Sequence, residues 1–181
     1  MKDYILKYRP FLLFLLQFFA SYILLILVYQ LYLNQFSIAR FEVDGITQLV
    51  AAQSQQVLQS LGYTVTSINS DVEPSVIIVV DGFPLVKIIE GCNAVSVMIL
   101  FASFVVAFNR GFWRTFIFIL SGSIGIYVLN VLRISLLTVG LLRFPEFKEV
   151  LHDIVFPIFI YGVVFFLWIL WIKKFSVYGK K

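Results

Sequence analysis

The feature that most constrains this chain is a set of four long apolar segments. These are residues 11–33, 92–108, 115–139 and 154–172, and each is close to the roughly 20 residues that a transmembrane helix needs. The first segment exceeds the apolar core of about 7–15 residues in a cleaved signal peptide, so we expect it to remain as an anchor. The sequence therefore predicts four membrane spans.

The composition agrees with a membrane protein and excludes several other classes. The chain is 61% hydrophobic and only 13% charged, whereas soluble domains are about 45–50% apolar and about 25% charged. A single cysteine excludes an internal disulfide and a dithiol redox pair, and a single histidine argues against a multi-histidine metal centre. We therefore expect no metal and no cofactor.

The basic residues predict the orientation of the spans. Nine of the fourteen lie on one side of the membrane under this assignment, which the positive-inside rule makes cytoplasmic. They are Lys2, Lys7, Arg9, Arg110, Arg114, Lys173, Lys174, Lys180 and Lys181. Both termini are therefore expected in the cytoplasm. Topology explains the net charge of +4, so no nucleic-acid role is needed.

The segment between the first two spans is predicted to form a small extracytoplasmic unit. Asp44 is a candidate N-cap for a helix that ends near Gly62, because apolar residues recur at helical spacing between them. Two β-branched runs, residues 75–80 and 85–89, are separated by Asp81-Gly82-Phe83-Pro84, and an Asp-Gly pair between such runs is typical of a hairpin. In the third span, the region of Gly122 and Gly125 reads as a close helix-packing surface.

These observations predict an all-α integral membrane protein: a four-helix transmembrane bundle with a small α+β extracytoplasmic excursion. Residues 1–33 would hold the cytoplasmic N-terminus and the first span. Residues 34–91 would form the extracytoplasmic helix and β-sheet. Residues 92–181 would hold the other three spans and the cytoplasmic C-terminus.

Three chemically reactive side chains fall at one predicted depth. At 1.5 Å per residue, Arg133 lies about 27 Å, Cys92 about 26 Å and His152 about 32 Å from the cytoplasmic ends of their helices. The hydrocarbon core is about 30 Å thick, so all three approach its outer boundary on three different helices. Each has an ordinary alternative: a buried apolar cysteine, an interfacial histidine, an arginine that snorkels outward. Their common level favours a shared site.

The three side chains suit acyl transfer by a thiol. Cys92 would open the second span, where the partial positive charge of a helix N-terminus favours a thiolate. Arg133 would stabilise the oxyanion of the tetrahedral intermediate, and His152 would exchange protons with the leaving amine and the incoming nucleophile. Three further residues are candidate supporting groups: Asn130, one helical turn before Arg133, and the carboxylates Glu90 and Asp153.

At these positions the sequence resembles the exosortase/archaeosortase family of integral-membrane cysteine transpeptidases. The resemblance covers residues 90–172. It rests on Glu90-Gly91-Cys92-Asn93-Ala94, then Asn130-Val131-Leu132-Arg133-Ile134, then His152-Asp153. Many members have a small residue and then glycine after the cysteine, where this chain has Asn93 and Ala94, and most have more spans. The chain is thus most similar to the short exosortase F-type proteins.

The resemblance implies a sorting enzyme at the bacterial inner (plasma) membrane, with its active site at the extracytoplasmic face. Cys92 would be the nucleophile, Arg133 the transition-state partner and His152 the acid–base residue. The substrates would be membrane-anchored secreted proteins with a C-terminal helix and basic tail, cleaved through a thioester and transferred to an acceptor. Expected partners are these substrates, the lipid bilayer and a membrane partner subunit, but no nucleic acid.

Two other functions compete with this prediction. A non-enzymatic membrane adaptor or assembly factor would act through the extracytoplasmic segment and would not need Cys92. A serine protease would pair Ser121 or Ser123 with His152, but Ser123 lies only about 12 Å from the cytoplasmic end of its helix, far from the level of His152. The cysteine transpeptidase therefore remains the better prediction.

Overall fold

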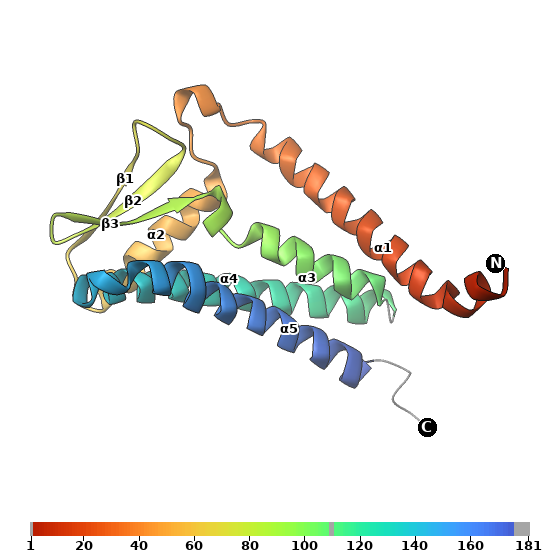
Figure 1. The fold of residues 1–181 in the computed structure, drawn as a ribbon. Helices are drawn as coiled ribbons and strands as arrows, with labels where there is room; N and C mark the ends of the chain where they lie inside the picture. The colour runs from red at the N-terminus through yellow and green to blue at the C-terminus, as the bar shows by residue number, and fades with distance from the viewer. Residues whose placement is uncertain (1, 109–110, 176–181) are drawn as a thin grey trace.

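A computed structural model describes residues 2–108 and 111–175; within them, the side chains of residues 2–7, 153, 174 and 175 are not described. Five α-helices and a three-stranded sheet make up the fold (Figure 1). The helices are α1 (Lys2–Leu33), α2 (Gly45–Ser60), α3 (Val95–Ala107), α4 (Phe112–Arg143) and α5 (Phe156–Phe175). The strands are β1 (Val65–Asn69), β2 (Ser75–Val80) and β3 (Phe83–Ile89). Short turns, η1 (Ile38–Arg40), η2 (Glu90–Cys92), η3 (Pro145–Phe147) and the π-helix η4 (Val150–Val155), join them.

Within residues 2–108 and 111–175, three helical segments are long and apolar enough to cross a membrane. They are Tyr8–Leu33, Phe112–Arg143 and Val150–Lys173. The predicted second span is a shorter apolar helix, because α3 has 13 residues and is about 20 Å long, less than the hydrocarbon core of about 30 Å. The structure thus supports three of the four predicted spans at full length, and the fourth is the shorter helix α3.

The apolar helix α3 lies between α1, α4 and α5. Phe101 of α3 is fully buried and belongs to a core with Ile126 of α4 and Trp171 of α5. A Cβ atom added at Gly122 would overlap the Phe101 ring, whereas one at Gly125 would meet nothing within 4 Å. The predicted close-packing surface is therefore confirmed at Gly122 and wrong at Gly125.

The segment between α1 and α3 folds largely as its sequence predicts. The Asp44 carboxylate accepts hydrogen bonds from the backbone N–H groups of Ile46 and Thr47, both at 3.0 Å, and so caps α2. Asp81 (φ 51°) and Gly82 (φ 86°) form the two-residue turn between β2 and β3. The additional strand β1 pairs antiparallel with β2, so that the sheet order is β1-β2-β3.

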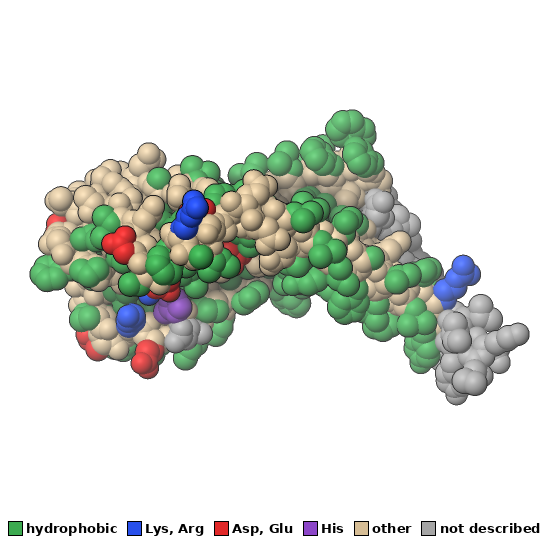
Figure 2. All heavy atoms as spheres, turned by 90° about the horizontal axis from the view of Figure 1, so that it is seen from above, with side chains coloured by type: hydrophobic (Ala, Val, Ile, Leu, Met, Phe, Trp, Pro, Cys, Tyr) green, Lys and Arg blue, Asp and Glu red, His purple; other side chains and the backbone are tan. Residues whose placement is uncertain are grey.

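One face of this sheet is packed against α2 and the C-terminal half of α4. Val50 and Leu58 of α2, Ile78 and Ile88 of the sheet, and Leu137 of α4 share a single core. The sheet consequently sits at one end of the long helices, and β3 points towards the start of α3 (Figure 1). Charged side chains gather around this end, whereas the helical part shows a mainly hydrophobic surface (Figure 2). This packing brings the C-terminal end of β3 next to α4.

Candidate active site

The predicted nucleophile, arginine and histidine meet at one cavity. Cys92, Arg133 and His152 all line a space of about 20 Å³, which is room for about one water molecule. Its remaining walls come from two elements, β3 and α4: Val86, Lys87, Ile88, Ile134 and Leu137. Ser121 and Ser123, the alternative nucleophiles, are not among its lining residues. The three residue types needed for thiol-based acyl transfer are therefore in one place.

Cys92 is positioned by the turn that joins β3 to α3. It is half-buried and ends the single turn η2, instead of opening the membrane helix as predicted. Ala94 has a left-handed backbone conformation (φ 66°), which a right-handed α-helix does not contain. For this reason α3 begins only at Val95. The thiol thus lies just outside the apolar helix.

The residue after the cysteine anchors this turn. Asn93 is 1% exposed. Its amide donates hydrogen bonds to the Tyr29 hydroxyl at 3.0 Å and to Thr47 Oγ1 at 3.2 Å, and its Oδ1 accepts one from the N–H of Val95 at 3.0 Å. One side chain therefore ties the Cys92 turn to α1, α2 and α3 together.

Asn130 holds the same turn from α4. It is 1% exposed, and its Nδ2 donates a hydrogen bond of 2.8 Å to the backbone carbonyl of Cys92. Its Oδ1 accepts from Nη1 of Arg133 at 3.5 Å. The supporting role predicted for Asn130 thus has a concrete geometry, because this amide bridges the cysteine backbone and the arginine.

Arg133 has one polar atom with no partner among the described residues. Its Nε is buried and makes no hydrogen bond there, although buried polar atoms are normally satisfied. The guanidinium carbon lies 5.9 Å from the centre of the Phe156 ring, at the start of α5, within the range of a cation–π contact. The ring and Asn130 hold the guanidinium at the cavity, while Nε keeps its capacity to donate.

His152 reaches the cavity from a stretch of π-helix. It lies in η4, where the N–H of Phe156 bonds to the carbonyl of Leu151, five residues earlier. Pro157 follows immediately, and a proline has no N–H with which to continue an α-helical ladder. π-Helical turns are frequent at functional sites, and this one places the exposed imidazole opposite Cys92 and Arg133.

The two carboxylates predicted as supporting groups have different outcomes. Glu90 lines a separate groove beside Gly91 and the end of α1, and it is not among the residues lining the Cys92 cavity. The side chain of Asp153 lies outside the described residues, as does Arg110. Among the residues that the structure describes, no group of three or more His, Cys, Asp or Glu side chains could hold a metal ion.

Sequence reasoning missed the contribution of β3 to the site. Lys87 lines the cavity although it lies outside the matched motifs, and Tyr29 and Thr47 support the cysteine turn from elements far away in sequence. A signal was present for Lys87, since it is the sole charged residue of its strand. Tyr29 gave no signal, because aromatic residues are common in membrane helices.

Comparison with known proteins agrees with the geometry. The family model for transmembrane exosortases matches residues 9–173, which include the cysteine, arginine and histidine of the cavity. No curated protein matches significantly, and no solved structure does. Because the match covers most of the chain, the protein belongs to the transmembrane exosortase family.

Proposed function

We propose that this protein is a cysteine transpeptidase that cleaves the C-terminal sorting signal of secreted proteins and transfers them to an acceptor. The substrates are membrane-anchored proteins with a C-terminal helix and basic tail. The enzyme resides in a bacterial inner membrane with both termini in the cytoplasm and its site at the outer face, as in the short F-type members of the family. The proposal also includes a second membrane protein as a partner subunit of the enzyme.

Cys92 begins the reaction. Its thiol proton passes to His152, and the sulfur attacks the scissile carbonyl carbon, forming a C–S bond. The oxyanion that results is stabilised by the Arg133 guanidinium, whose Nε makes no hydrogen bond to another described residue. When the C–N bond breaks, the leaving amine takes the proton from His152, and a thioester remains on Cys92.

The second half of the reaction reverses these roles. The acceptor nucleophile gives its proton to His152 and attacks the thioester carbonyl, which forms the new acyl bond and breaks the C–S bond. The sulfur leaves and is reprotonated by His152. The enzyme returns to its starting state with no net change in protons or electrons.

The observation that carries this proposal is the shared cavity. Cys92, Arg133 and His152 come from η2, α4 and η4, and yet they line one space about the size of a water molecule. The buried Nε of Arg133 has no hydrogen-bond partner among the described residues, although a folded protein normally satisfies such a donor. An oxyanion formed at Cys92 is the ligand that suits this donor.

The experiment follows a tagged secreted passenger fused to the C-terminal helix and basic tail of a secreted protein from the same genome. We expect Cys92→Ala to abolish its processing. Arg133→Lys keeps the charge but changes the donor geometry, and we expect the rate to fall about 100-fold to 1000-fold, as for loss of an oxyanion donor. Arg143→Lys, on the exposed end of the same helix, is the control and should process normally.

Two results would overturn the proposal. Processing at the wild-type rate in Cys92→Ala would exclude the thiol as nucleophile. A cellular function that survives Cys92→Ala and is lost on disruption of residues 34–91 would instead identify a membrane adaptor.

A further inference from the structure

A larger groove lies next to the Cys92 cavity. Its volume is about 330 Å³. It runs between β3, the C-terminal part of α4 and the segment that leads into η4. The groove and the cavity share four lining residues, Val86, Lys87, Leu137 and His152. A molecule lying in the groove therefore contacts residues that also surround the thiol.

The groove runs along β3, an edge strand of the sheet, and also reaches Ile77 of the neighbouring strand β2. β3 is the last strand in the order β1-β2-β3, and among the described residues only β2 hydrogen-bonds to its backbone. Val86 belongs to the buried face of β3, and Leu85 and Lys87 to the opposite face, and all three line the groove. An unpaired edge of this kind is a template for an added strand, and peptide-binding proteins use it in this way.

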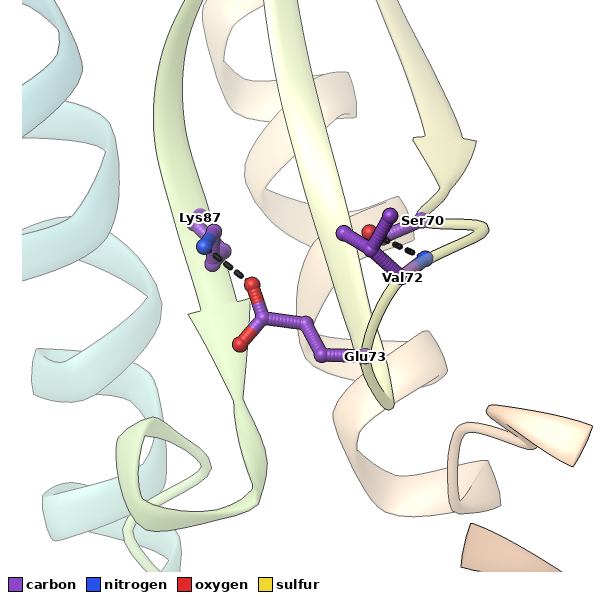
Figure 3. A network of polar contacts seen from close by, with 4 residues as sticks. All are labelled: Ser70, Val72, Glu73 and Lys87. Carbon is purple, nitrogen blue, oxygen red and sulfur yellow. Dashed lines mark hydrogen bonds and ion pairs between the residues drawn. The ribbon is translucent and has the colours of Figure 1, made fainter. Parts of the chain in front are cut away.

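The charge of the walls restricts the occupant. Two cationic side chains, Lys87 and Lys148, line the groove, and no carboxylate does. Glu73, from the loop between β1 and β2, forms an ion pair with Lys87 (Figure 3). Lys148 forms no ion pair in the part of the chain that the structure describes. The lining consequently favours an extended segment that carries acidic side chains.

The strand direction fixes how such a segment would lie. β3 runs from the Asp81–Gly82 turn to η2 and so leads directly to Cys92 (Figure 1). A substrate anchored by a C-terminal membrane helix also runs from outside towards the membrane. It would therefore pair parallel to β3, with its scissile bond reaching the thiol as its chain enters the bilayer.

We propose that the substrate binds as an extended, acidic segment that adds to the free edge of β3 in parallel, in the groove lined by Leu85, Lys87 and Lys148. This binding mode rests on the proposed transpeptidase function for its location beside Cys92. It assigns substrate recognition to β3, Lys87 and Lys148, which lie outside the three motifs around Cys92, Arg133 and His152. Lys148 would select acidic side chains of the substrate, and the substrate backbone would lie beside Leu85.

The first test is photo-crosslinking in the full-length Cys92→Ala protein in membranes. Benzoylphenylalanine replaces Leu85, or, as a control, the exposed Thr66 on the opposite edge strand. The probes are tagged passengers carrying C-terminal tails of secreted proteins from the same genome, each with an acidic segment before its apolar helix. We expect tagged adducts at Leu85 and none at Thr66. Equal crosslinking at both positions, adducts with lipid alone, or no adduct would overturn the docking proposal.

The second test uses charge. We expect Lys148→Glu to raise KM for a processed tail about tenfold, since it turns attraction into repulsion at an exposed position, with kcat changed less than twofold. Arg40→Glu, exposed in η1 and outside the groove, should leave KM unchanged. Exchanging the tail's acidic residues for lysine should restore KM with Lys148→Glu. An unchanged KM with Lys148→Glu would refute the charge role.

The experiments distinguish failure of the thiol mechanism from failure of the docking mode at β3. If Leu85 crosslinks the tail but Cys92→Ala still processes it, the docking mode stands and the thiol mechanism fails. If processing requires Cys92 but Leu85 captures no tail, the mechanism stands and the docking mode fails.

Discussion

The hydrogen bond from Asn130 to the carbonyl of Cys92 offers the sharpest single perturbation of the site. Asn130→Asp preserves the size of the side chain and the oxygen that faces Arg133. Its carboxylate has no donor for the Cys92 carbonyl, which lies 2.8 Å from Nδ2 in the wild type, and it adds a negative charge beside Arg133. Leaving a buried acceptor without its partner costs about 1–3 kcal/mol. If the loss is expressed in the transition state, it corresponds to a rate about 5-fold to 150-fold lower, because about 1.36 kcal/mol equals a factor of ten.

The assay is single-turnover processing of the tagged passenger, with thermal unfolding in detergent as a parallel readout. We expect Asn130→Asp to lower kcat by this factor, with little change in KM, because the substrate does not bind to the Cys92 carbonyl. Asn69→Asp, on an exposed position of β1, is the control and should behave as wild type. A wild-type kcat in Asn130→Asp would refute the positioning role of this donor.

Three further predictions concern stability, read as the midpoint of thermal unfolding in detergent. Gly122→Ala should destabilise by about 1–3 kcal/mol because its Cβ overlaps the buried Phe101 ring, whereas Gly125→Ala should not; equal midpoints would contradict the close packing. Ala94→Gly should be tolerated at φ 66° and Ala94→Val should not, so equal tolerance would show that this turn relaxes. Asp44→Ala should cost about 0.5–2 kcal/mol by uncapping α2, and an unchanged midpoint would argue against that cap.

Local patterns in the sequence were sufficient to predict most elements. The Asp44 cap, the helix after it and the Asp81–Gly82 hairpin depend on neighbouring residues, and the structure confirms all three. The length of α3 was overestimated because hydropathy does not report backbone angles. The left-handed conformation of Ala94 delays the start of that helix, and no apolar count contains this information.

The site was predictable in part for the same reason. The helical rise was enough to place Cys92, Arg133 and His152 at one level, and the structure puts them around one cavity. The predicted link between Asn130 and Arg133 follows from their spacing of three residues on α4. In contrast, the contribution of β3 depends on how the sheet packs against α4, which is a tertiary contact between segments about 50 residues apart.

The glycine expected by resemblance after the cysteine has a structural explanation. Members of the family often carry a small residue and then glycine at the positions of Asn93 and Ala94. In this chain Ala94 adopts a positive φ of 66°, a conformation that glycine enters without strain. A glycine at position 94 would thus fit this turn, and the buried Asn93 makes hydrogen bonds to Tyr29 and Thr47 that a smaller side chain would lack.

Detection of the acyl-enzyme is the most direct test of thiol catalysis at this cavity. The wild-type protein is mixed with the tagged passenger and quenched in acid during the first turnover, and its peptides are analysed by mass spectrometry. Cys92 is the sole cysteine, so a thioester has one site at which to form. We predict a hydroxylamine-sensitive adduct on Cys92 that carries the new C-terminus of the passenger. Processing with no such adduct, or processing at the wild-type rate in Cys92→Ala, would contradict a catalytic role for this thiol.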